Sequence, residues 1–250
     1  MKLKKLFNLL KTANEGLFNS SYPIIWAMRV IPFIFFVSVS LGQWTNFKLD
    51  QLSDYSKESE ALFRQAGFAA THHYPVEINK GNRIIYGWSI IKSSSSNGFL
   101  PTLHSQLKVT WNLYLKGRMA AYSSKEGAVQ MYGWGLSFRP GKEDTPSNWI
   151  VNFNSGRLYS HDQVRVSALQ VNVERKLNLK KLPIHLGFGM NILKANPYLQ
   201  FEDSYMEKVE IQTNFINVGS STTFFGMQLI PQIWLAPKYS MVSLTIVGEL

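Results

Sequence analysis

The chain has 250 residues, which suits one large barrel or globular domain, and its 45% hydrophobic content excludes a disordered chain. The absence of cysteine excludes disulfide scaffolds, Cys-ligated zinc, iron–sulfur clusters and thiol catalysis, and a mean hydropathy of -0.09 argues against a bundle of membrane helices. The formal charge of +10 is spread along the chain, apart from one group at Arg175, Lys176, Lys180 and Lys181, so no nucleic-acid partner is expected.

The amino-terminal region has the parts of a secretory signal. Residues 30–41 carry no charge, follow Arg29 and end in small residues. This arrangement predicts a signal peptide over residues 1–42. Because residues 28–41 already make a complete short signal, we interpret residues 1–27 as an over-extended start of the reading frame. A membrane anchor is the alternative, although Arg29 falls inside its apolar window.

Residues 43–65 predict a short amphipathic helix that precedes the barrel. Its apolar residues fall at helix-like intervals, and Gly67 follows as a candidate C-cap. We expect the apolar stripe to pack on the barrel and to cap or plug its periplasmic end. The residues of the stripe are Leu49, Leu52, Leu62 and Phe63.

Residues 66–250 change to a period of two, which predicts β-strands. Clear alternation covers 107–116, 132–139, 148–154, 164–174, 184–192 and 209–215, and weaker candidates cover 66–74, 83–92, 223–235 and 241–249. The total is about ten strands. The phase slips between Ala168 and Leu169, which predicts a bulge, and Pro231 predicts an edge, an end or a bulge in its strand.

Two-faced strands fit a membrane barrel and also a soluble one, which keeps its apolar side chains inside. The predicted signal, the strand lengths and the polar residues in series on one face favour an antiparallel up-and-down transmembrane β-barrel in the outer membrane. The predicted lumen-facing residues are Lys108, Asn112, Lys116, Arg118, Arg139, Arg165, His185 and Glu210. The predicted lipid-facing residues are Trp111, Leu113, Trp134, Phe138, Trp149, Phe153 and Phe188.

The sequence resembles small Gram-negative outer-membrane β-barrel proteins with a short helix before the barrel. The resemblance rests on the ending SLG before Gln43, on QMYGWGLSF at 130–138, on LPIHLGFGMN at 182–191 and on the alternating last strand. It implies membrane lipid and the barrel-assembly machinery as partners. The last residue is Leu250, whereas the family's assembly signature ends in an aromatic residue.

No catalytic, metal or cofactor site is predicted. His72 and His73 are adjacent, as are His104 with Ser105 and Ser160 with His161, and neighbours on a strand face apart. The chain has neither an HExxH motif nor a GxSxG elbow. The interpretation is therefore a structural protein, or one that passes or binds a small, preferably anionic solute. The alternatives are a secreted soluble β-barrel or sandwich with an apolar ligand, and an outer-membrane lipid-modifying enzyme.

Overall fold

The computed structural model describes residues 44–49, 55–75, 83–95, 98–124, 127–161, 163–179, 182–198, 200–201, 204–205, 208–224 and 227–249. The predicted signal peptide at 1–42 and the terminal Leu250 lie outside these residues. The elements are α3 (Tyr55–Thr71), β1 (Ile84–Ser93), β2 (Phe99–Lys108), β3 (Leu113–Ser124), β4 (Gly127–Phe138), β5 (Trp149–Ser160), β6 (Val164–Leu179), β7 (Leu182–Pro197), β8 (Gln200–Phe201), β9 (Ser204–Tyr205), β10 (Val209–Ser220), β11 (Thr222–Phe224), β12 (Met227–Ala236) and β13 (Tyr239–Glu249).

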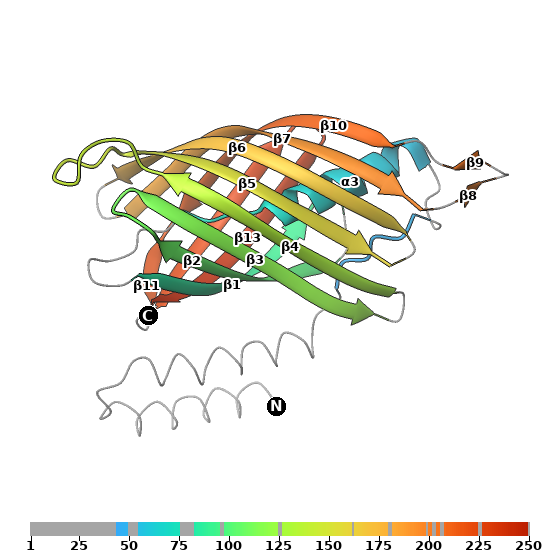
Figure 1. Ribbon diagram of the computed structural model, residues 1–250, viewed down its shortest axis with the longest axis horizontal. Helices are drawn as coiled ribbons and strands as arrows, with labels where there is room; N and C mark the ends of the chain where they lie inside the picture. The colour runs from blue at the N-terminus through green and yellow to red at the C-terminus, as the bar shows by residue number, and fades with distance from the viewer. Residues whose placement is uncertain are drawn as a thin grey trace, which may run out of the picture. The chain divides into compact units, whose positions relative to one another are not determined.

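Ten antiparallel strands form a closed barrel, as the alternation predicted (Figure 1). Strands β1 to β7 pair in chain order, β10 joins β7 to β12, and β13 closes the ring by pairing with β12 and β1. We call the end where β1 begins and β13 ends the termini end. The opposite end, which holds the β1–β2, β3–β4, β5–β6 and β12–β13 connections, is called the hairpin end.

The predicted irregularity at Pro231 marks a break in the ladder. Pairing between β10 and β12 runs from Ile216 opposite Leu235 to Gly219 opposite Gln232 and then stops. Pro231 is the next residue of β12, where the pairing with β10 is not continued, and β12 pairs with the short β11 beyond it. Proline cannot donate to a ladder, so this break is a position that tolerates it.

The chain passes lengthwise through the barrel before it forms the wall. At the hairpin end, the Thr45 amide donates to the Phe99 carbonyl (3.0 Å) and the Tyr122 hydroxyl donates to the Thr45 carbonyl (2.8 Å). Helix α3 then runs inside the ring of strands (Figure 1). The wall begins at the termini end, where Ile84 of β1 pairs with Leu107. The helix is therefore part of the barrel's interior.

Helix α3 starts later and ends later than predicted. It covers Tyr55–Thr71, so the predicted boundary at residue 65 is wrong, and the weak strand candidate at 66–74 is the second half of the helix and the segment after it. The cause is the surroundings of the helix. It packs against β4, β5, β6, β7 and β13, and every residue from Gln65 to Thr71 is buried, so this half of the helix lacks the one-sided apolar stripe of a surface helix.

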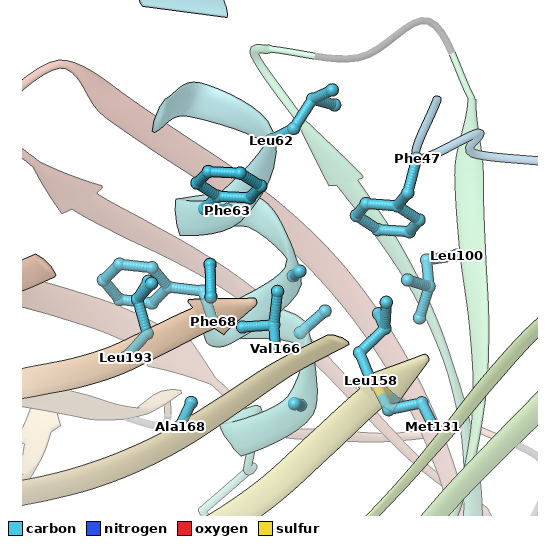
Figure 2. Close-up of a cluster of buried hydrophobic side chains, with 14 of the residues drawn as sticks. Phe47, Leu62, Phe63, Phe68, Leu100, Met131, Leu158, Val166, Ala168 and Leu193 are labelled. Atoms are coloured by element: carbon cyan, nitrogen blue, oxygen red, sulfur yellow. The ribbon is translucent and has the colours of Figure 1, made fainter. Parts of the chain in front are cut away.

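Large apolar side chains fill the space between the helix and the wall (Figure 2). Phe68 stacks on Tyr239 with ring centroids 4.9 Å apart and meets Phe215 edge-on at 5.3 Å. Phe63, Phe68 and Leu193 of β7 belong to the same cluster, and Leu193 lies near Phe68 (Figure 2). Burying side chains of this size contributes about 1.5 to 3 kcal/mol each, so the helix is held mainly by apolar packing.

The predicted continuous strand over 107–116 is wrong. Strand β2 ends at Lys108, β3 begins at Leu113, and the amides of Val109 and Thr110 donate to the Leu113 carbonyl in the turn between them. The four turn residues keep the apolar and polar alternation of the flanking strands, which is why the sequence pattern concealed the reversal. Among the described helices, none is long and apolar enough to cross a membrane.

Candidate functional site

Along β6 the inward face changes from apolar to polar. On β6, Val164, Val166 and Ala168 point inward at the hairpin end, and Gln170, Asn172 and Glu174 continue the same face toward the termini end. Pairing of β6 with β5 and β7 runs unbroken through Ala168 and Leu169, so the predicted bulge is wrong. The apparent phase slip arose because one inward face carries apolar side chains beside α3 and polar ones beyond it.

The carboxyl end of α3 docks in a notch made by two glycines. Gly133 of β4 and Gly156 of β5 are cross-strand partners. A Cβ atom on Gly156 would lie 2.0 Å from the Ala70 carbonyl oxygen, and one on Gly133 would lie 2.8 Å from it. The Arg118 Nη1 atom donates to that oxygen at 3.1 Å. A guanidinium thus meets a carbonyl of the helix's last turn, where the helix dipole is negative.

Arg118 also ties the helix end to the wall. Its Nη2 atom donates to Asn154 Oδ1 (2.8 Å) and to the Trp134 carbonyl (3.2 Å). The Arg118 side chain is 5% exposed. A buried guanidinium needs such acceptors, because an unpaired charge in this environment would cost several kcal/mol. Arg118 is therefore a positioning residue for the end of the helix.

The segment after the helix enters a buried polar cluster centred on His73 and Glu174. Glu174 Oε1 lies 2.9 Å from His73 Nε2 and accepts hydrogen bonds from Asn217 Nδ2 (2.7 Å) and Asn172 Nδ2 (3.2 Å). On the other side of the ring, Gln170 Nε2 lies 3.1 Å from His73 Nδ1. The wall therefore holds both nitrogens of one imidazole, which fixes the ring's orientation.

Further contacts extend this cluster across the lumen. The Thr71 hydroxyl lies 2.9 Å from Gln170 Oε1 and accepts from Asn191 Nδ2 at 2.7 Å. Lys116 Nζ donates to Asn152 Oδ1 at 3.1 Å. Two small cavities adjoin these groups, one beside His72 and His104 and one beside Glu174 and Arg139, and each has a volume of about 10 Å³. That space holds about one water molecule.

The predicted lumen-facing residues fall into three groups. Lys116, Arg118 and His185 are buried on the inner face, while Lys108 and Arg139 are half-buried at strand ends in the inward phase. Asn112 lies in the turn before β3. Arg165 and Glu210 lie on the outer face, so their prediction as lumen residues is wrong. Both belong to strands whose inward positions near the hairpin end are taken by apolar contacts with α3, which leaves the outward positions for charge.

The predicted lipid-facing residues lie mostly on the outer face. The exposed fractions are 50% for Trp134, 44% for Phe138, 40% for Trp149 and 59% for Phe188, and Phe153 is half-buried beside Trp134 with ring centroids 5.7 Å apart. Leu113 is the first residue of β3 and Trp111 lies in the turn before it, so neither lies at mid-span. Trp111 therefore belongs to a turn at the end of the barrel and not to the outer face of a strand.

One contact with catalytic residue types was missed by the sequence pattern. His72 Nε2 lies 2.9 Å from Ser243 Oγ on β13, although the two residues are 171 positions apart. Both side chains are buried, and the adjoining cavity of about 10 Å³ has no room for a substrate. Among the described residues, no group of three or more His, Asp or Glu side chains is arranged to hold a metal ion.

No family model matches the chain, and no curated protein matches it. Solved structures similar to it include the translocator domain of autotransporter NalP from Neisseria meningitidis, with 11% identity, a TM-score of 0.42 and coverage of 77% of this chain and 95% of that one. The KdgM porin in complex with disordered oligogalacturonate has 9% identity, a TM-score of 0.39 and coverage of 66% and 99%. Omp33 from Acinetobacter baumannii has 8% identity, a TM-score of 0.33 and coverage of 68% and 98%. Because these TM-scores are all below 0.5, the three similarities do not extend the description of the fold.

The glycine notch yields a prediction about stability. In Gly156→Ala, the new methyl group would meet backbone at the Ala70 carbonyl, so the helix must shift and the contact with Arg118 is lost. We expect a loss of about 2 to 4 kcal/mol in the free energy of unfolding, measured by urea titration in lipid vesicles. Gly117→Ala is the control, because its Cβ would meet only the Ser105 hydroxyl, which can rotate away. Equal stability of the two variants would contradict the claim that the end of the helix needs the glycine at position 156.

Proposed function

We propose that this protein is an outer-membrane β-barrel with a permanently closed lumen and a structural role. The first support is the outer face. Many large apolar side chains point away from the barrel and are 36% or more exposed, on nearly all strands of the wall. A soluble protein rarely exposes a continuous apolar surface of this extent. A hollow of about 720 Å³ also lies on this face, lined by apolar side chains that include Val171, Phe188 and Leu235.

The second support is the height of the apolar band. On β6 the outward positions between Arg165 and Arg175 are Ser167, Leu169, Val171 and Val173. Ten residues at about 3.3 Å each, tilted by about 40°, span about 25 Å along the barrel axis, which is the height of a membrane barrel's apolar band. The cations at both limits lie over aromatic rings: Arg165 is 5.3 Å from the Tyr159 ring and Arg175 is 5.4 Å from the Trp149 ring. Aromatic girdles occupy these two interfaces in membrane barrels.

The closed lumen is the observation that carries the structural role. An open pore for polar solutes needs a polar lining, but the wall around α3 is apolar. Removing the helix would expose this apolar wall to water together with Phe63 and Phe68, at a cost of about 25 cal/mol for each Å². The helix is therefore a constitutive part of the core, and the barrel serves as a membrane-embedded support.

The membrane orientation predicts an asymmetric response to charge on one face of β6. Val171→Arg places a cation near the middle of the band and should cost about 2 to 4 kcal/mol, whereas Ser167→Arg lies near the interface and should cost about 0 to 1 kcal/mol. Urea titration in vesicles measures both variants. In a soluble barrel both side chains would face water, and the two costs would be equally small.

Passage of an anion is a second candidate function, favoured by the charges of the polar half. Lys116 and Arg118 outnumber Glu174 among the buried ionised side chains of the described lumen. If the helix moved aside, this excess would favour anions, and the preference would weaken with salt as the Debye length shrinks from about 10 Å at 0.1 M to about 3 Å at 1 M.

Planar-bilayer recording distinguishes the two functions. For the closed barrel, we expect the purified full chain to insert, to need detergent for extraction and to keep a compact species in unheated SDS, without discrete conductance steps at any salt concentration. Anion-selective steps from the wild-type protein would replace the structural role by passage of a solute. A protein that stays in solution without detergent would reject the membrane barrel itself.

A further inference from the structure

The outer face near the hairpin end carries a cluster of two arginines and two tyrosines that the closed barrel does not require. Arg157 and Tyr159 lie on β5, with Tyr132 opposite Arg157 on β4 and Arg165 opposite Tyr159 on β6. All four occupy outward positions of their strands. We call these four residues the Arg–Tyr cluster.

The contacts within the Arg–Tyr cluster hold the side chains together on the outer wall. The Tyr132 and Tyr159 rings stack with centroids 6.0 Å apart and an interplanar angle of 23°, and their hydroxyl oxygens lie 3.3 Å apart. The Arg157 side chain interacts with both tyrosines, and the Arg165 guanidinium lies over the Tyr159 ring. The two tyrosine rings thus form a platform on which both guanidinium groups are positioned.

The cluster retains donors for a ligand. Each guanidinium has five N–H donors, and the contacts above use only part of this capacity. Arg157 is exposed on the outer wall, so its remaining N–H groups can be reached from outside the barrel. Phosphate oxygens match the planar fork of arginine.

The surrounding charge favours an anionic ligand. Tyr132 and Arg157 belong to a row of cross-strand partners that crosses successive strands of the wall. The next residues in this row are Ser167, Lys194 and Glu210. Glu210, the acidic residue of this row, pairs with Lys194 at 3.2 Å and lies on β10, three strands from Arg157. The described residues therefore place a net positive charge on the outer wall at the level where lipid head groups would lie.

We propose that the Arg–Tyr cluster binds the phosphate group of an anionic membrane lipid. This inference rests on the proposed membrane orientation, which puts the cluster at the interface and the apolar outward side chains of β6, such as Leu169 and Val171, beside the acyl chains. The two arginines grip the phosphate from neighbouring strands, and the tyrosine hydroxyls supply further hydrogen bonds. At the opposite interface, the described residues include Arg175 over the Trp149 ring.

Native mass spectrometry of the full chain in detergent micelles tests the site, with phosphatidylglycerol as the anionic lipid and phosphatidylcholine as the zwitterionic comparison. We expect the wild type to retain phosphatidylglycerol in preference to phosphatidylcholine. The double variant Arg157→Gln with Arg165→Gln should bind phosphatidylglycerol about tenfold more weakly, because it loses charge-assisted hydrogen bonds. The matched control Arg175→Gln removes a cation over an aromatic ring at the other interface and should bind as the wild type does.

Three outcomes would overturn the proposal. Equal binding by the double variant and the wild type would show that the cluster does not hold the lipid. An equal loss in Arg175→Gln would show a general effect of charge. Displacement of the lipid by inorganic phosphate at matched concentration would assign the site to a soluble phosphate compound. In each case a detergent requirement and a compact species in unheated SDS would leave the membrane barrel standing, so that the two proposals fail separately.

Discussion

The docking of helix α3 inside the barrel is the constraint on which the rest of the structure depends. The helix ends where the Ala70 carbonyl enters the Gly133–Gly156 notch and receives the Arg118 guanidinium. Its apolar body requires an apolar wall on one side of this point, and the chain after it requires polar partners on the other side. The inward face of β6 therefore changes character partway along, between Ala168 and Gln170.

This change of character explains which features could be predicted from the sequence. Alternation depends only on the local geometry of a strand, so it predicted the barrel and the last strand. The total of ten strands agreed because the false candidate at 66–74 offset the merging of β2 and β3 in the candidate at 107–116. It cannot say which face is inward when one inward face carries apolar side chains over part of its length and polar side chains over another part. Arg165 and Glu210 were placed on the wrong face for this reason. The bulge at Ala168 was predicted for the same reason, although the pairing of β6 with β5 and β7 is regular there.

Contacts distant in sequence account for the rest of what the pattern missed. The turn at 109–112 continues the alternation of its neighbours, so only the hydrogen bonds to Leu113 reveal the reversal. The contacts of His73 with Glu174 and of His72 with Ser243 join residues more than 100 positions apart. One signal was available in the sequence. The polar faces of the predicted strands would need hydrogen-bond partners if they were buried, and the adjacent His72 and His73, directly before the barrel, supply such partners.

Hydrogen–deuterium exchange of the full chain in lipid nanodiscs tests the central claim, that α3 is a permanent part of the barrel core, most directly. Amides buried with the core open only with global or subglobal unfolding, whereas those of a movable plug exchange through local opening. The account predicts that the amides of residues 62–70 exchange as slowly as those of the middle of β5 and β6. Exchange of the helix orders of magnitude faster than that of these strands would contradict it.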